Sequence, residues 1–112
     1  MESPFYGYYH MKTPAIEESW STHDLRGFLV GDCGFTQDQG HFRHRGFFCR
    51  VELLNVKTYD SWSSRDYDSD KTNFVSITTA KKLPPEAQEF LARLGERLNA
   101  PLCDGHEGEV NQ

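Results

Sequence analysis

The stretch GFFCRVELLNVK, residues 46–57, constrains the fold more than any other part of this sequence. In an extended strand, successive side chains point to opposite faces, so one face would carry a run of apolar residues: Phe47, Cys49, Val51 and Leu53. The other face would carry Phe48, Arg50 and Glu52. The apolar residues then continue on the opposite parity, as Leu54 and Val56. We therefore predict a β-strand that has a bulge near Leu53 and Leu54 or is buried on both faces at that end.

Three further stretches carry strand patterns. Residues 26–35, RGFLVGDCGF, hold an apolar run interrupted by glycines, which favours a kinked or bulged first core strand over a helix. The polar segment 36–45 predicts a hairpin loop that leads into residues 46–57. Residues 72–79, TNFVSITT, predict a third strand with Val75 and Ile77 on one face. The N-terminal PFYGYYH is compatible with an edge strand.

Two stretches carry helix signals. Pro84 and Pro85 suit a first helical turn, and the residues after them place apolar side chains at helical spacing: Ala87, Phe90, Leu91, Leu94 and Leu98. This pattern predicts an amphipathic helix that Asn99 and Pro101 close. Thr13 and Pro14 are a weaker start signal, from which we expect a short helix to about Ser21.

The order strand, strand, strand, helix predicts an α+β fold. We expect a three- to four-stranded antiparallel meander sheet with the C-terminal amphipathic helix packed on it, a short N-terminal helix, and the N-terminal piece covering a sheet edge. A chain of 112 residues has the size of one domain. We therefore expect a single domain over residues 1–112, with residues 1–12 and 104–112 loosely ordered.

The net charge and the cysteine content limit which cellular compartments and which binding partners we expect. A formal net charge of −5 disfavours general attraction to nucleic acid or to anionic lipid, and suits a partner with a basic surface. No apolar run approaches the length of a membrane span, and the N-terminus lacks the pattern of a signal peptide. The three cysteines, irregularly spaced, fit reduced thiols. We expect a cytoplasmic protein without membrane contact and without a cofactor.

The segment TYDSWSSRDYDSD, residues 58–70, is the main candidate binding site. Aromatic side chains supply stiff contact area and carboxylates steer a basic partner, so this composition is typical of a recognition patch. The candidate residues are Tyr59, Asp60, Trp62, Arg65, Asp66, Tyr67, Asp68 and Asp70. The alternative is a solvated connection whose rings fold back over the core. A calcium loop is disfavoured because Lys71 and Thr72 stand where its glycine and later ligands should begin.

The stretch from residue 33 to residue 50 offers a second kind of site. Two thiols and two imidazoles could satisfy tetrahedral zinc, in the order Cys33, His41, His44 and Cys49. The spacing matches no standard zinc motif, and cysteines that pack as small apolar residues are the commoner case. Arginines interleaved with aromatic residues in HFRHRGFF are also found in single-strand nucleic-acid binders, which the overall acidity argues against.

These observations favour a small domain that works by contact and not by catalysis. No local signature of a nucleophile appears, and Cys33 with His23 and Asp24 is one of many arbitrary trios. We predict an inhibitor or immunity protein, similar in composition to anti-CRISPR and toxin-immunity proteins, that masks a basic surface of a larger protein. The alternative is a metal-binding or nucleic-acid-binding module that uses the hairpin 33–50. Unpaired sheet edges also allow a homodimer through an edge strand.

Overall fold

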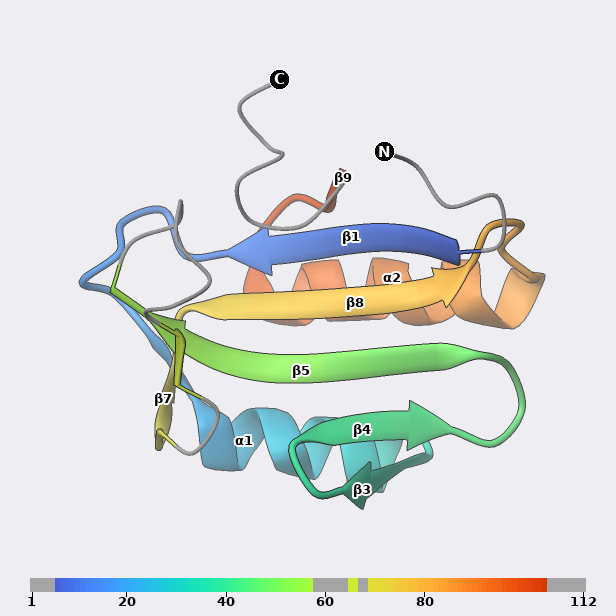
Figure 1. The fold of residues 1–112 in the computed structure, drawn as a ribbon, viewed down its shortest axis with the longest axis horizontal. Helices are drawn as coiled ribbons and strands as arrows, with labels where there is room; N and C mark the ends of the chain where they lie inside the picture. Colours follow the sequence, from blue (N-terminus) through green and yellow to red (C-terminus); the bar gives the residue numbers. More distant parts are fainter. Residues whose placement is uncertain (1–5, 58–64, 67–68, 105–112) are drawn as a thin grey trace.

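The computed structural model describes residues 6–57, 65–66 and 69–104, and shows the predicted α+β class. One antiparallel sheet dominates, and both helices lie behind it in Figure 1. Along the sheet the strands are β3 (Phe35–Asp38), β4 (His41–His44), β5 (Cys49–Val56), β8 (Phe74–Ala80), β1 (Tyr6–Lys12) and β9 (Cys103–Asp104). Also in the described parts of the chain, β6 (Arg65–Asp66) pairs with β5, and β2 (Trp20–Ser21) pairs with β7 (Lys71–Thr72).

The sheet is wider than the predicted three to four strands. Residues 36–45, predicted to be a loop, form the hairpin of β3 and β4, with Asp38 paired to His41 and a turn at Gln39 and Gly40. Residues 6–12, expected to be loosely ordered, pair with β8 along their whole length, from Tyr6 opposite Ala80 to Lys12 opposite Phe74. β9 then pairs with the far side of β1 at two positions.

Residues 22–32 are helical, so the predicted first core strand over residues 26–35 is wrong. Helix α1 (Thr22–Gly27) continues into η1 (Phe28–Asp32), which has π-helical hydrogen bonding. The Ser21 hydroxyl caps α1 by accepting a hydrogen bond from the Asp24 amide at 3.2 Å. Leu25, Phe28 and Leu29 recur at helical spacing, and all three are buried against the sheet.

The predicted N-terminal helix from Thr13 to Ser21 is also absent. The Thr13 hydroxyl donates to the carbonyl oxygen of Ala15 at 2.8 Å, and the Glu18 amide donates to the same oxygen at 3.0 Å. Thr13 therefore stabilises a turn, since Ser and Thr hydroxyls can bond nearby backbone groups in place of starting a helix.

Helix α2 (Pro85–Leu98) packs on the same face of the sheet as α1. Its buried residues are Ala87, Phe90, Leu91, Leu94 and Leu98, and it ends at Asn99 in the left-handed conformation, with φ 53°. The main core lies between this helix layer and the inward residues of the sheet, among them Met11, Phe42, Val51, Val75 and Ile77. None of the helices in the described ranges is long and apolar enough to span a membrane.

The change of parity in β5 is explained by burial on both faces. The pairing of β5 with β8 runs without interruption from Cys49 opposite Thr79 to Leu54 opposite Phe74, so no bulge occurs. Beyond Leu53 the face turned away from the helices is covered as well, and a second cluster of Leu54, Val56 and Phe74 forms there, with Ile16 packed against it. Both faces of the sheet are therefore buried at this end.

Candidate functional site

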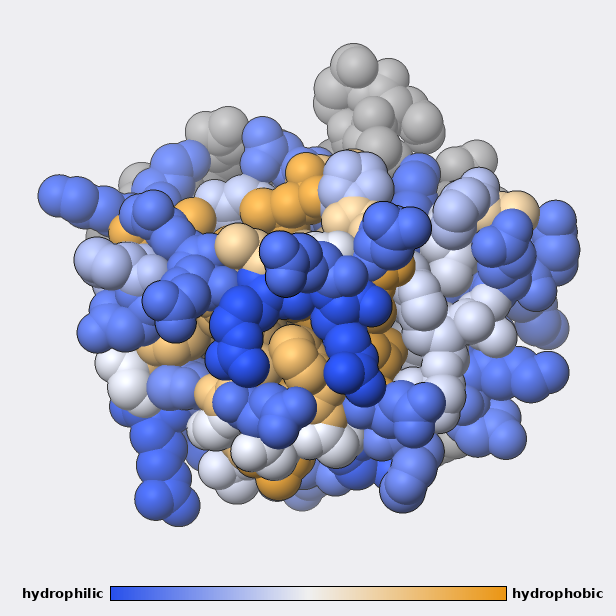
Figure 2. All heavy atoms as spheres, turned by 180° about the vertical axis from the view of Figure 1, so that it is seen from behind, coloured by the Kyte–Doolittle hydropathy of each residue, from blue (hydrophilic) through white to orange (hydrophobic). Residues whose placement is uncertain are grey.

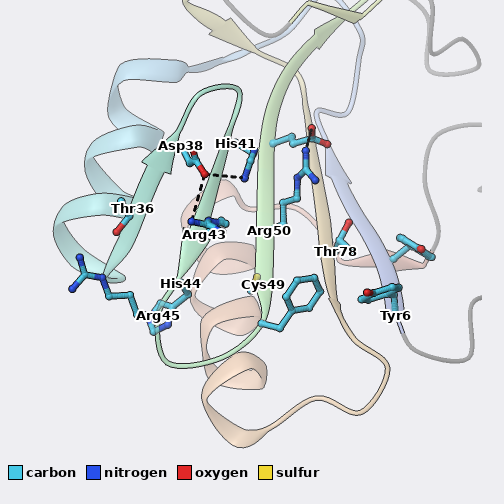
Figure 3. Close-up of a pocket in the computed structure, with 13 residues that line it drawn as sticks. Tyr6, Thr36, Asp38, His41, Arg43, His44, Arg45, Cys49, Arg50 and Thr78 are labelled. Carbon is cyan, nitrogen blue, oxygen red and sulfur yellow. Dashed lines mark ion pairs between the residues drawn. The ribbon is translucent and has the colours of Figure 1, made fainter.

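The face of the sheet turned away from both helices carries the best-formed surface site among the described residues. Side chains that alternate with the core residues of five strands line a hollow of about 1080 Å³ there (Figure 3). We call the following residues the open-face patch: Tyr6, Tyr8, Thr36, Asp38, His41, Arg43, Arg45, Phe48, Arg50, Glu52 and Thr78. His44 and Cys49 reach the rim of the same hollow.

Ion pairs hold two of the three arginines of the open-face patch. Arg43 Nη2 lies 3.5 Å from Asp38 Oδ2, and Arg50 Nη2 lies 3.6 Å from Glu52 Oε2. His41 Nε2 lies 3.9 Å from the same oxygen of Asp38. Both arginines of these pairs are exposed, so the pairs add little stability, but they restrict the arginine side chains before any ligand binds. Arg45 makes no ion pair with the residues that the structure describes.

Aromatic side chains form the other end of the open-face patch. The rings of Tyr6 and Phe48 lie 5.5 Å apart at a 45° tilt. Tyr6 is 44% exposed and Phe48 is 51% exposed, so this pair presents apolar surface to solvent beside Arg50. Exposed aromatics next to arginines are the composition enriched in protein interfaces.

Among the described residues, the helix side of the molecule has a smaller hollow, of about 390 Å³ beside α2. The surface on this side is mainly hydrophilic, with only small hydrophobic areas between charged groups (Figure 2). The guanidinium groups of Arg93 and Arg97 lie over the Phe28 ring, 5.7 and 5.2 Å from its centroid, and Phe28 is itself buried. The two guanidinium groups therefore cover the Phe28 ring with groups of the same chain.

The predicted acidic aromatic site lies mostly outside the described residues. Tyr59, Asp60, Trp62, Tyr67 and Asp68 fall there, and Arg65 and Asp66 are described only as the backbone of β6. Asp70 is exposed, and its carbonyl oxygen accepts a hydrogen bond from the Thr22 amide at 3.1 Å. The role of this segment therefore remains a prediction from composition.

The structure does not bring the four zinc candidates together. His41 and His44 lie three positions apart on β4 and so point to opposite faces of the sheet: His41 contacts Asp38, and His44 packs against Phe35 and Phe47. Cys49 is buried in the main core. Within the described ranges no three His, Cys, Asp or Glu side chains are grouped so that they could hold a metal ion.

Burial makes the cysteine thiols of the core poor nucleophiles. Loss of solvent raises the pKa of Cys49 to about 12 from its ordinary 9.0. Loss of solvent also raises the pKa of Cys33, opposed by the positive charge of Arg93 and assisted by the negative charge of Asp32. Since the thiolate is the reactive form, neither residue is suited to nucleophilic chemistry at neutral pH.

This shift predicts a pH dependence of stability. The unfolded Cys49 thiol ionises near pH 9, whereas the folded thiol keeps its proton up to about pH 12, so the free energy of unfolding should fall as pH rises through this window. Denaturant unfolding at pH 8 and pH 10 should show a steeper fall for the wild type than for Cys49→Ala. The Cys103→Ala variant is the control, because Cys103 is only half-buried. Equal pH slopes for wild type and Cys49→Ala would contradict the assignment.

Comparison with known proteins adds no family to this picture. No protein-family model, curated protein or solved structure matches the chain. The argument about function therefore rests on the open-face patch and on the sequence.

Proposed function

We propose that the chain is a binding protein that acts by contact and uses the open-face patch to hold another protein. The observation that carries this proposal is the exposed Tyr6 and Phe48 pair beside Arg50, on a sheet face that neither helix covers. Buried aromatic and arginine residues contribute most of the binding energy in many interfaces. An inhibitor or immunity protein, similar in size and acidity to anti-CRISPR and toxin-immunity proteins, fits this mode of action.

The mixed charge of the open-face patch favours a protein over a nucleic acid as the ligand. Asp38 and Glu52 stand among its arginines and would repel a phosphate backbone, while they leave Arg43 and Arg50 already oriented. The net charge of −5 adds a repulsion that acts over the whole molecule. A protein surface can offer both signs of charge together with an apolar side chain to fill the space between the rings.

We further propose that the acidic segment 58–70 contacts a basic region of the same partner. The support is its composition, four aspartates and three aromatic residues among thirteen positions. The proposed mode of action needs no catalytic group, in keeping with the raised thiol pKa values of Cys33 and Cys49. The proposed location is the cytoplasm, which the three free cysteines support.

The test compares two exposed hydrophobic positions on opposite sides of the molecule. Wild type, Phe48→Ala and Val30→Ala would each be immobilised and exposed to extract of the native host; Val30 is 46% exposed but lies on η1, in the helix layer. We expect a protein that is retained by the wild type and by Val30→Ala. Its affinity for purified Phe48→Ala should be at least about 30-fold lower, which corresponds to about 2 kcal/mol.

Two results would overturn the proposal. One is a partner that binds Phe48→Ala and Tyr6→Ala as tightly as it binds the wild type. The other is tight binding of a fluorescent single-stranded oligonucleotide with a steep dependence on salt, because that dependence marks phosphate contacts and would make the ligand a nucleic acid.

A further inference from the structure

Strand β3 leaves one edge of the sheet unpaired. It stands at the end of the strand order and pairs only with β4 among the described residues. Thr36 and Gln37 point to opposite faces and are both exposed, so the edge is accessible at these two residues, whereas the Phe35 side chain is buried in the core. The strand Phe35–Asp38 contains no proline and no lysine, the residues that commonly protect an edge from pairing.

The hairpin register shows which backbone groups face outward. Asp38 and His41 flank a two-residue turn, and such a closing pair is hydrogen-bonded. Because bonded and non-bonded pairs alternate, Thr36 also directs its N–H and C=O toward β4. The N–H and C=O groups of Phe35 and Gln37 therefore point to the open edge.

A second β3 strand fits this edge in one symmetric register. With a two-fold axis at Thr36, Phe35 of each copy lies opposite Gln37 of the other, and the two pairs can form four backbone hydrogen bonds. Residues of the same parity face each other, so the side chains stay on matching faces of the joined sheet. No like charges lie directly opposite each other in this register.

The charges of the two copies are complementary in the same register. Asp38 of one copy comes close to Gly34 of the other in this register, and Arg45 directly follows the end of β4. Figure 3 shows Arg45 directed outward on the β3 side of the open-face patch. Asp38 is 45% exposed, so it can accept this arginine while it keeps its contact with Arg43.

We propose that two copies of this chain associate through their β3 edges to form a two-fold dimer with one continuous sheet. The dimer is independent of the function proposed above, and it would place two open-face patches on the same face of the joined sheet. Three residues of β3 from each copy, Phe35 to Gln37, pair in this register and bury less area than a permanent interface needs, so the association is concentration-dependent. Val30 is exposed on η1, which contacts β3.

Sedimentation equilibrium over a series of protein concentrations tests this dimer. The mass of the wild type should rise from the chain mass of 12.9 kDa toward twice that value. Thr36→Lys and Thr36→Glu should each remain at 12.9 kDa, because like charges would meet at the two-fold axis. An equal mixture of the two variants should form the dimer again, because opposite charges then meet. The control Ala92→Lys changes an exposed residue of α2 by the same charge and should dimerise as the wild type does.

Circular dichroism would establish that each variant is folded before its mass is interpreted. A wild type that stays at 12.9 kDa at millimolar concentration would overturn the proposal. So would a folded Thr36→Lys variant that associates as strongly as the wild type. A mixture of Thr36→Lys and Thr36→Glu that stays monomeric while the wild type dimerises would show that the axis does not pass through Thr36, which also overturns it.

Discussion

Replacing Asn73 with alanine is expected to lower the free energy of unfolding by about 3–5 kcal/mol, because two buried hydrogen bonds and one part-buried hydrogen bond would lose a partner at once. The side-chain nitrogen of Asn73, Nδ2, donates to the carbonyl oxygens of Ile16 at 3.0 Å and of Val56 at 2.9 Å. Its side-chain oxygen accepts from the Val56 amide at 2.9 Å. Asn73 is only 2% exposed, so the backbone groups that it pairs have little access to solvent in the folded protein.

Urea unfolding of Asn73→Ala and Asn55→Ala would measure this effect. Asn55 is the matched control, because its side chain donates one exposed hydrogen bond, to the Lys71 carbonyl oxygen at 3.1 Å. Its replacement should cost less than about 1 kcal/mol. The contacts of Asn73 indicate that it joins residues 13–16 to the ends of β5 and β8. Similar losses of stability for the two variants would contradict this role.

The second large effect is expected at Phe74, where alanine should lower the free energy of unfolding by about 3–5 kcal/mol. The Phe74 side chain is fully buried, packs with Leu54 and Val56, and stacks on the His10 ring at 5.1 Å with an angle of 9°. Its removal would leave a cavity in the small cluster that closes the second side of the sheet.

Phe48 provides a control of the same residue type on the same face of the sheet. It is 51% exposed, and Phe48→Ala should change the free energy of unfolding by less than about 1 kcal/mol. Thermal or urea unfolding of both variants gives the comparison directly. A loss at Phe48 as large as the loss at Phe74 would show that the open-face patch belongs to the core, and would weaken its assignment as a binding surface.

The α+β class could be predicted from the sequence because long alternating patterns carry it. Residues 49–56 and 74–80 form strands of eight and seven residues, and the parity change at Leu54 indicated either a bulge or burial on both faces at that end, of which the structure shows the second. The width of the sheet could not be predicted in this way. Strands β3, β4 and β9 are two to four residues long and are defined by their pairing partners, because so short a segment contains no period to detect.

The error at residues 26–35 has a specific cause. Gly27, Gly31 and Gly34 were interpreted as interruptions of a strand, whereas the apolar residues also fit helical spacing, and a short apolar run cannot distinguish the two. The decisive signal lay upstream, where Ser21 precedes Asp24 by three residues and caps the helix. A serine or threonine followed by an acidic residue at that distance marks a helix start.

Only the part of the open-face patch that lies on or beside β5 could be predicted. Arg50 and Glu52 were assigned to the face of β5 opposite the main core, and their places on the open face, Arg50 exposed and Glu52 half-buried, agree with that alternation. Tyr6 and Thr78 join them because β1 pairs with β8, about seventy positions later in the chain. A contact of this range depends on the whole fold, and local sequence patterns do not encode it.

The two faces of the sheet have different tasks. Residues on the helix-covered face stabilise the fold, and residues of the open-face patch are available for the proposed binding. On the strands that carry the open-face patch, the positions that face the helices hold the hydrophobic layer together, and the patch positions between them, apart from the second cluster of Leu54, Val56 and Phe74, contribute little to that layer. Mutations at Tyr6, Arg43, Phe48 and Thr78 can therefore accumulate at little cost to stability. Such a scaffold can follow a changing target over evolutionary time, and it offers a natural starting point for selecting new specificities from a library randomised at those four positions.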